Sequence, residues 1–152
     1  MRLVVLIGAL AASLLARATP FNDSVKVCED NPRYDLRPGL KIACRVRVDE
    51  IRSRGYTTLL SKGLITEPGS FTLRVDQPQE GGRFSFFINL GDGPGPRATY
   101  ADPVKPGKTY DLVAGWDGKE IYLTVNGSTH RSPRTGRPQG NFTPLTVGPL
   151  KV

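Results

Sequence analysis

Apolar and polar residues alternate along most of the chain with a period of two. The clearest run is residues 41–48, in which every second side chain is apolar and Arg45 and Arg47 lie on the polar side. Successive side chains of a β-strand point to opposite faces, so this pattern predicts a strand with one buried and one solvated face. No segment has a convincing helical period. Further strand-like runs, each bounded by Gly, Pro, Asn or Asp, occur at residues 56–61, 70–76, 83–90, 109–116, 120–125 and 144–148. Short strands at this spacing predict an all-β antiparallel sandwich or barrel.

Two tight-turn signals, Asp117-Gly118 and Asn126-Gly127, lie close together in the second half of the chain. Both dipeptides tolerate the positive φ angles that two-residue hairpin turns require. They predict a three-stranded meander over residues 109–132. Gly118 is expected to need positive φ, whereas Gly95 lies in a loop already rich in glycine and proline. A valine at position 118 is therefore expected to damage folding more than a valine at position 95.

The first eighteen residues have the organisation of a secretory signal peptide. A basic residue is followed by an apolar stretch over residues 3–15 and by Ala16-Arg17-Ala18, a small-x-small cleavage pattern. We expect cleavage before Thr19 and a secreted or periplasmic mature chain without a membrane span. The alternative is an N-terminal membrane anchor that is kept. Residues 19–152 have the length of one domain with one core.

The chain is moderately basic. Lys and Arg number 21 against 14 Asp and Glu, a net charge of +7. Removing the predicted signal peptide takes away two arginines and leaves +5, with the basic residues scattered singly through the predicted strands. This is not the pattern of a nucleic-acid-binding protein, and it favours acidic glycans or anionic surfaces over cationic partners.

Two cysteines, Cys28 and Cys44, occur in a chain that is predicted to be exported. An oxidising compartment favours their pairing, so we expect a disulfide, which would stabilise the fold by roughly 3 kcal/mol through loop closure. The alternative is two buried thiols that never meet. These cysteines and the single His130 are far apart in sequence, and no second histidine is present, so no metal site of Cys and His ligands is predicted.

Residues 106–127, PGKTYDLVAGWDGKEIYLTVNG, resemble the hallmark hairpin of the laminin-G-like jelly rolls, which belong to the concanavalin A-like lectin and glucanase superfamily. Other segments resemble further strands of that family in the same order, so that the resemblance covers nearly all of residues 21–150. These segments are residues 36–50, 56–63, 70–76, 83–90 and 142–148. The resemblance implies a two-sheet antiparallel sandwich.

Three departures from the family pattern stand out. Cys44 stands where many members carry a core tryptophan, and the aromatic residue that usually opens the strand at position 109 is shifted to Tyr110. The family usually continues after the late glycine with one more strand. Either the N-terminal segment 21–27 fills that place or the chain is a shortened member.

The sequence contains no recognisable catalytic set. Glucanases of the superfamily carry a Glu-x-Asp-x-x-Glu triplet, or a variant of it, on one strand, and no such triplet occurs here. A Ser-His-Asp triad would have to use His130, which lies in a polar segment. We therefore predict a protein that is not an enzyme and has no cofactor. The resemblance leaves room for one calcium ion at the sandwich rim, with Asp92 of NLGDGPG as its acid, against the alternative of an acid in a flexible turn.

Exposed cations and aromatic residues are the candidates for ligand contact. Arg45, Arg47 and Arg74 form a basic stripe if their strands are neighbours in one sheet. Tyr100 is a rim candidate, and Trp116 either stacks on a sugar ring or caps the core.

The resemblance and the charge together predict a secreted, non-catalytic module that binds carbohydrate or a glycosylated partner and favours acidic glycans. The alternative is a structural or adhesion domain that makes protein contacts. Three sequons, which become glycosylated only in a host that modifies them, begin at Asn22, Asn126 and Asn141.

Overall fold

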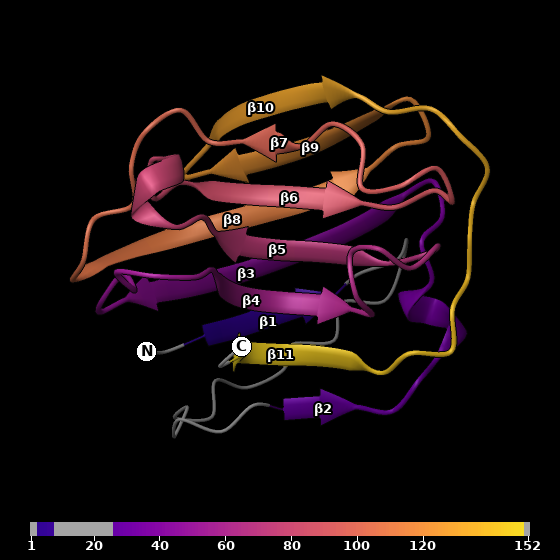
Figure 1. Ribbon diagram of the computed structural model, residues 1–152, viewed down its shortest axis with the longest axis horizontal. Coiled ribbons are helices and arrows are strands. Elements are labelled where there is room, and N and C mark those ends of the chain that lie inside the picture. The colour runs from indigo at the N-terminus through magenta and orange to yellow at the C-terminus, as the bar shows by residue number, and fades with distance from the viewer. Residues whose placement is uncertain (1–2, 8–25, 151–152) are drawn as a thin grey trace.

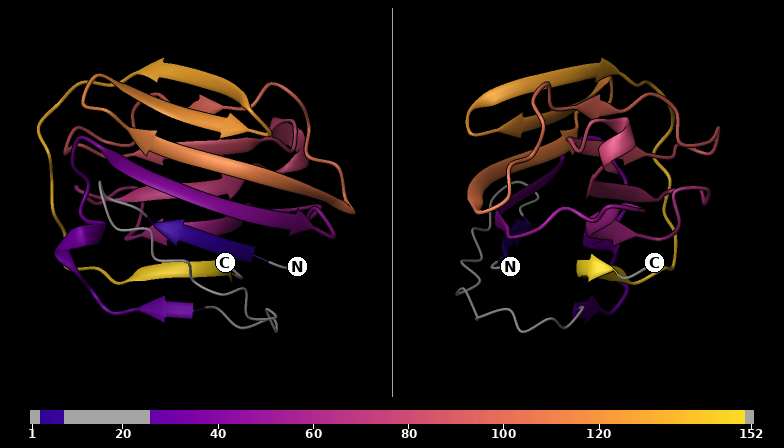
Figure 2. Two further views of the ribbon diagram at one scale, coloured as in Figure 1. Left: turned by 180° about the vertical axis from the view of Figure 1, so that it is seen from behind. Right: turned by 60° about the vertical axis from the view of Figure 1, so that its left-hand side comes forward.

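The structure is a computed structural model that describes the backbone of residues 3–7 and 26–150 and the side chains of residues 29–148. In this part of the chain two antiparallel sheets face each other, as Figure 1 and Figure 2 show. The five-stranded sheet has the order β1 (Leu3–Ile7), β3 (Leu40–Val48), β8 (Lys108–Trp116), β9 (Glu120–Val125), β10 (Ser128–Pro133). The six-stranded sheet has the order β2 (Lys26–Cys28), β11 (Leu145–Leu150), β4 (Thr57–Lys62), β5 (Phe71–Val75), β6 (Phe84–Ile88), β7 (Ala98–Thr99). Two short 3-10 helices, η1 (Pro32–Tyr34) and η2 (Pro78–Glu80), lie in connecting segments. The predicted all-β antiparallel sandwich is confirmed.

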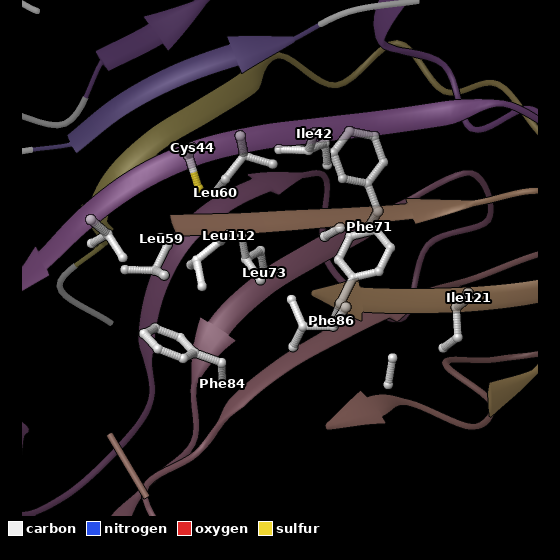
Figure 3. Close-up of a cluster of buried hydrophobic side chains, with 14 of the residues drawn as sticks. Ile42, Cys44, Leu59, Leu60, Phe71, Leu73, Phe84, Phe86, Leu112 and Ile121 are labelled. Carbon is white, nitrogen blue, oxygen red and sulfur yellow. The ribbon is translucent and has the colours of Figure 1, made fainter. Parts of the chain in front are cut away.

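The core lies between the two sheets and follows from the alternation in the sequence. Ile42, Cys44 and Leu112 point inward from the five-stranded sheet, and they meet side chains such as Leu73 and Phe86 from the six-stranded sheet (Figure 3). Opposite residues of paired strands share a face, so one register places every second side chain in the core. Burying this apolar surface is the main favourable term in the stability of the sandwich.

The predicted meander is present as β8, β9 and β10, and its two turns differ in kind. At the first turn, Asp117 Oδ1 accepts hydrogen bonds from the main-chain N–H groups of Lys119 (2.9 Å) and Glu120 (2.8 Å), while Gly118 has φ +100°. At the second turn Asn126 has φ 48° and Gly127 has φ 88°. Two consecutive positive φ angles fit a type I′ hairpin turn, for which Asn-Gly is the preferred pair.

The loop at Gly95 is less permissive than its composition suggests. Gly95 has φ +55°, and a Cβ atom there would lie 2.5 Å from Cζ of Arg134. The corresponding atom at Gly118 would meet only Pro38, at 3.4 Å. The reason for expecting Gly118→Val to be more damaging than Gly95→Val is therefore wrong, because Gly95 also has positive φ and a buried guanidinium occupies the space that a side chain would need.

The N-terminal segments add one edge strand to each sheet. β1, which lies within the predicted signal peptide, pairs with β3 from Leu3↔Val46 to Ile7↔Ile42. β2 pairs with β11, with Cys28 opposite Leu145. Residues 26–28 thus take the position beside the late strand, while residues 21–25, with the sequon at Asn22, lie outside the described residues. The predicted cleavage site at residues 16–18 also lies outside them, so cleavage remains a prediction.

The predicted Cys28–Cys44 disulfide is not formed. Cys44 is a free, buried thiol on β3, and its sulfur points into the core (Figure 3). Cys28 ends β2, an edge strand of the opposite sheet. Burial raises the pKa of the Cys44 thiol to about 12, with a smaller contribution from Asp111.

Among the residues that the structure describes, no helix is long and apolar enough to cross a membrane.

Candidate functional site

The three arginines that were expected to form a stripe lie in different sheets. Arg45 and Arg47 belong to β3 of the five-stranded sheet and Arg74 to β5 of the six-stranded sheet, so no common stripe forms. Arg45 binds Asp111 on the neighbouring strand through Nε (2.6 Å) and Nη2 (3.0 Å). Arg47 Nε binds Asp49 at 2.8 Å. Both ion pairs are solvent-exposed and contribute little to stability.

The two aromatic candidates differ in exposure. Trp116 is 0% exposed, and its Nε1 donates to the main-chain oxygen of Arg134 at 2.7 Å. It caps the core, and its ring is not accessible for stacking on a sugar. Tyr100 follows β7 and is half-buried, with its ring edge-to-face with that of His130 at a centroid distance of 5.4 Å. Burial, and then Asp102, raise the pKa of Tyr100.

The outward-pointing positions of the six-stranded sheet carry mainly polar side chains. In Figure 1, β4, β5 and β6 of this sheet lie in front of β3 and β8. Opposite residues share a face, so the strand register gives two parallel rows across this surface. One row is Thr146, Ser61, Thr72 and Phe87; the other is Thr58, Arg74, Ser85 and Thr99. Most of these side chains are small and end in hydroxyl groups, and they are largely covered by their neighbours: Ser61 and Thr72 are each 8% exposed and Ser85 is 0% exposed.

Arg74 is the centre of this surface. Its guanidinium carbon lies 3.5 Å from the centroid of the Tyr56 ring and 4.4 Å from that of Phe87. Its Nε donates to Asp76 Oδ1 at 2.8 Å. The two rings and the carboxylate restrict the side chain to one conformation, and cation–π contacts of this kind each contribute about 0.5–1 kcal/mol when partly exposed.

Asp76 is a buried carboxylate that joins two arginines. Its side chain is 1% exposed and accepts hydrogen bonds from Ser85 Oγ (2.5 Å) and Arg97 Nη1 (3.4 Å) as well as from Arg74. A buried charge is tolerated only when it is paired and hydrogen-bonded. The arginines and the serine meet that requirement, so they are fixed in place around Asp76.

Glu80, at the end of η2, completes the group. It accepts hydrogen bonds from the Tyr56 hydroxyl (2.5 Å), Gln77 Nε2 (2.9 Å) and Arg97 Nη1 (3.2 Å). The Tyr56 hydrogen bond, with smaller contributions from Gln77, Arg97 and Arg74, lowers the pKa of Glu80 to about 2. We call the set Tyr56, Arg74, Asp76, Glu80, Phe87 and Arg97 the Arg74 cluster.

Further arginines lie in the segments beside the cluster. The loop that carries Arg52 and Arg54 is tied to η2, because Gln79 Nε2 donates to the main-chain oxygen of Ser53 at 3.3 Å. Arg83 directly precedes β6. Within residues 29–148 none of these three arginines forms a salt bridge. This end of the sheet therefore has an excess of positive charge.

Sequence reasoning identified Arg74 but missed the rest of the cluster. Phe87 interrupts the alternation of FSFFI and points outward, which was the one available signal. Tyr56, Glu80 and Arg97 come from loops or loop ends, and their convergence on Asp76 depends on the tertiary structure. No group of three or more His, Cys, Asp and Glu residues suited to a metal ion occurs in the part of the chain that the structure describes.

Comparison with solved structures identifies the fold. The structure of the mouse laminin α1 chain, domains LG4-5, superimposes with a TM-score of 0.62 and 20% sequence identity. The match covers 99% of this chain, which spans 35% of that laminin chain. The carbohydrate-binding module CBM66 from Bacillus subtilis matches with a TM-score of 0.41 and 14% identity, over 72% of this chain and 74% of that one. No family model and no curated protein matches the sequence. The chain has the concanavalin A-like, laminin-G-like sandwich fold.

Proposed function

We propose that this chain is an exported, non-catalytic module that binds carbohydrate on the outer face of its six-stranded sheet and favours acidic glycans. The observation that carries the proposal is the Arg74 cluster, of which Arg74 and Phe87 belong to the two rows of mainly small hydroxyl side chains. A carboxylate or sulfate group of a glycan pairs well with a guanidinium that is held in a fixed orientation.

The cluster is organised before any ligand binds. Arg74 is clamped between Tyr56 and Phe87, and Arg97 is held by Asp76 and Glu80. A ligand that binds there does not have to order these side chains, which lowers the entropic cost of binding. The unpaired arginines nearby attract anionic ligands from solution.

The chemistry of the two carboxylates favours binding over hydrolysis. A glycosidase needs one protonated carboxyl group as a general acid near neutral pH. The pKa of Glu80 is about 2, so this group is ionised at neutral pH, and Asp76 is enclosed by Arg74, Ser85 and Arg97. Glu80 therefore does not have the environment of a general acid.

The first experiment is a glycan array followed by calorimetry with the best acidic glycan at several salt concentrations. The proposal expects selective binding that weakens with salt, because screened charge contacts contribute to it. Release of reducing sugar from a panel of β-glucans would contradict the non-catalytic assignment.

A matched pair of variants locates the site. Thr72→Glu places a negative charge on the outer face of the six-stranded sheet, and Thr124→Glu does so on the outer face of the five-stranded sheet. We expect Thr72→Glu to abolish binding of an acidic glycan and Thr124→Glu to leave it unchanged, with circular dichroism confirming that both variants fold. Weaker binding in the double variant Arg45→Ser/Arg47→Ser, with Thr72→Glu unaffected, would move the site to the other sheet.

One observation favours the alternative of a protein-contact domain. Phe142 is 96% exposed and Leu64 is 69% exposed. They belong to two segments that are joined by a hydrogen bond from Asn141 Nδ2 to the main-chain oxygen of Pro68 (3.3 Å). No binding on the array, together with self-association that Phe142→Ser abolishes in analytical ultracentrifugation, would support this alternative.

A further inference from the structure

The loop between β6 and β7 is closed by an internal cation. Arg134 Nη1 donates to Asp92 Oδ2 at 2.9 Å, and Nη2 donates to Asp92 Oδ1 at 2.5 Å. Nη2 also donates to the main-chain oxygen of Gly93 at 2.9 Å. Both carboxylate oxygens of Asp92 and one carbonyl of its loop are therefore bound by a single guanidinium.

Arg134 is held firmly from its other side. Its main-chain N–H donates to Lys119 O at 2.7 Å, and its main-chain oxygen accepts from Trp116 Nε1 at 2.7 Å. Residues 116 and 119 belong to the β8–β9 hairpin of the five-stranded sheet, whereas Asp92 follows β6 of the six-stranded sheet. The side chain thus ties the rims of the two sheets together, and it is only 7% exposed.

The residues at this rim do not fit a calcium ion. Calcium takes six to eight oxygen ligands, chiefly carboxylates and main-chain carbonyls. Both Asp92 carboxylate oxygens and the Gly93 carbonyl already accept hydrogen bonds from Arg134. A divalent ion bound to these oxygens would face the positive charge of the guanidinium. The part of the chain with described side chains offers no cluster of acids that would replace them.

We propose that the Arg134 guanidinium takes the place of the rim cation, so that the fold is independent of calcium. The guanidinium supplies two functions of a metal ion at such a loop: it neutralises Asp92 and it gathers carboxylate and carbonyl oxygens around one centre. Its fork matches both carboxylate oxygens at once, which a lysine ammonium does not do.

Two features of the loop agree with this role. Gly95 leaves room for the guanidinium, since a Cβ atom there would lie 2.5 Å from Cζ and 2.7 Å from Nη1 of Arg134. The hydrogen bond from Arg134 lowers the pKa of Asp92, so the carboxylate stays ionised as the pair requires.

Thermal unfolding of the full chain tests directly whether calcium stabilises the fold. We expect the same midpoint in EDTA, in millimolar calcium chloride and in magnesium chloride, and no heat of calcium binding in calorimetry. A midpoint that rises with calcium, or a calcium isotherm of one site per chain, would overturn the proposal.

A double-mutant cycle tests whether the Arg134 guanidinium stabilises the fold through its interaction with Asp92. Arg134→Met and Asp92→Asn should each lower the midpoint by several degrees, and the double variant should be little worse than Arg134→Met alone, because both changes remove one interaction. Each single change should also speed amide exchange at Gly93 and Gly95. Arg131→Met, at an exposed arginine whose ion pairs are long, is the control and should leave the midpoint nearly unchanged.

The cycle also has an outcome that contradicts the proposal. Effects of Arg134→Met and Asp92→Asn that simply add would show that the two groups do not act together. If Arg134→Met fails to fold, Asp92→Asn decides alone, because Asp92 is 62% exposed and its amide is tolerated there. An unchanged midpoint and unchanged exchange in Asp92→Asn would then reject the role of the pair.

Discussion

The guanidinium carbon of Arg74 lies 3.5 Å from the centroid of the Tyr56 ring, and the hydroxyl of the same tyrosine donates to Glu80. One aromatic side chain therefore connects a cation on its face with an anion at its tip. The ring keeps Arg74 pointing along the sheet surface, and Glu80 keeps the ring in place. Two substitutions at position 56 separate these contributions.

Tyr56→Phe keeps the ring and removes the hydroxyl, and Tyr56→Leu removes both. We expect Tyr56→Phe to lower the free energy of unfolding by about 1 kcal/mol, the contribution of one hydrogen bond at a half-buried position. Tyr56→Leu should cost about 0.5–1 kcal/mol more through the lost cation–π contact. Urea unfolding measures both values. Equal values for the two variants would show that the ring face contributes nothing.

Acid should weaken the cluster in a defined pH window. The pKa of Glu80 falls from a usual value of 4.5 to about 2 on folding. A carboxyl group whose pKa is lowered in the folded state stabilises it fully above the unfolded pKa, and this stabilisation is lost as the pH falls through the folded value. We expect the free energy of unfolding to drop between about pH 4.5 and pH 2, and Glu80→Gln to show a shallower drop. Parallel pH profiles for the two proteins would contradict the assignment.

Gly115 on β8 has no room for a side chain. A Cβ atom there would lie 2.3 Å from the main-chain oxygen of Leu40 and 2.4 Å from the Tyr122 hydroxyl. Gly115→Ala must displace a neighbouring strand. We therefore expect the free energy of unfolding to fall by about 1–3 kcal/mol, the usual cost of overpacking. Gly140→Ala is the control, because Gly140, like Gly115, lacks positive φ and a Cβ atom there would approach only the Asp35 carboxyl group, at 3.2 Å. Thermal unfolding compares the two, and a smaller loss at position 115 would contradict the packing.

The thiol of Cys44 should be unreactive in the folded protein. Its thiol is buried and its pKa is about 12, so it holds almost no thiolate at neutral pH. The thiolate is the reactive form. In a Cys28→Ser variant we expect Ellman's reagent to react with Cys44 only at the rate at which the chain unfolds, and rapidly in urea. Fast labelling under native conditions would show that the core opens at β3.

Export should change two measurable properties: the mass of the mature chain and the rate at which the amide hydrogens of β3 exchange with solvent. Cleavage before Thr19 would remove β1, which pairs with β3 between Ile42 and Val46. We expect mass spectrometry of the exported protein to give an N-terminus at or near Thr19, and amide exchange of β3 to be faster than in the full chain. A mature protein that still begins at residue 1 would rule out the signal peptide and favour the retained anchor.

The sequence by itself determined the fold class of this protein and the three-stranded meander over residues 109–132. Strict alternation over residues 41–48 and the turn pairs at 117–118 and 126–127 act over a few residues, so they can be interpreted without knowing the rest of the chain. Period-two patterning specifies which face of each strand is buried, and turn residues specify where neighbouring strands connect. The same local rules also pointed to Arg74 as an outward-facing cation.

The partners of each side chain were decided only by the tertiary structure. Cys28 and Cys44 are 16 positions apart in the sequence, yet they belong to opposite sheets. Arg134 meets Asp92 across 42 positions. Alternation specifies the face of a strand but not the sheet it joins or the loop that folds over its end. Long-range packing of the two sheets decides both, and it therefore also decided which arginines are paired and where the proposed binding face lies.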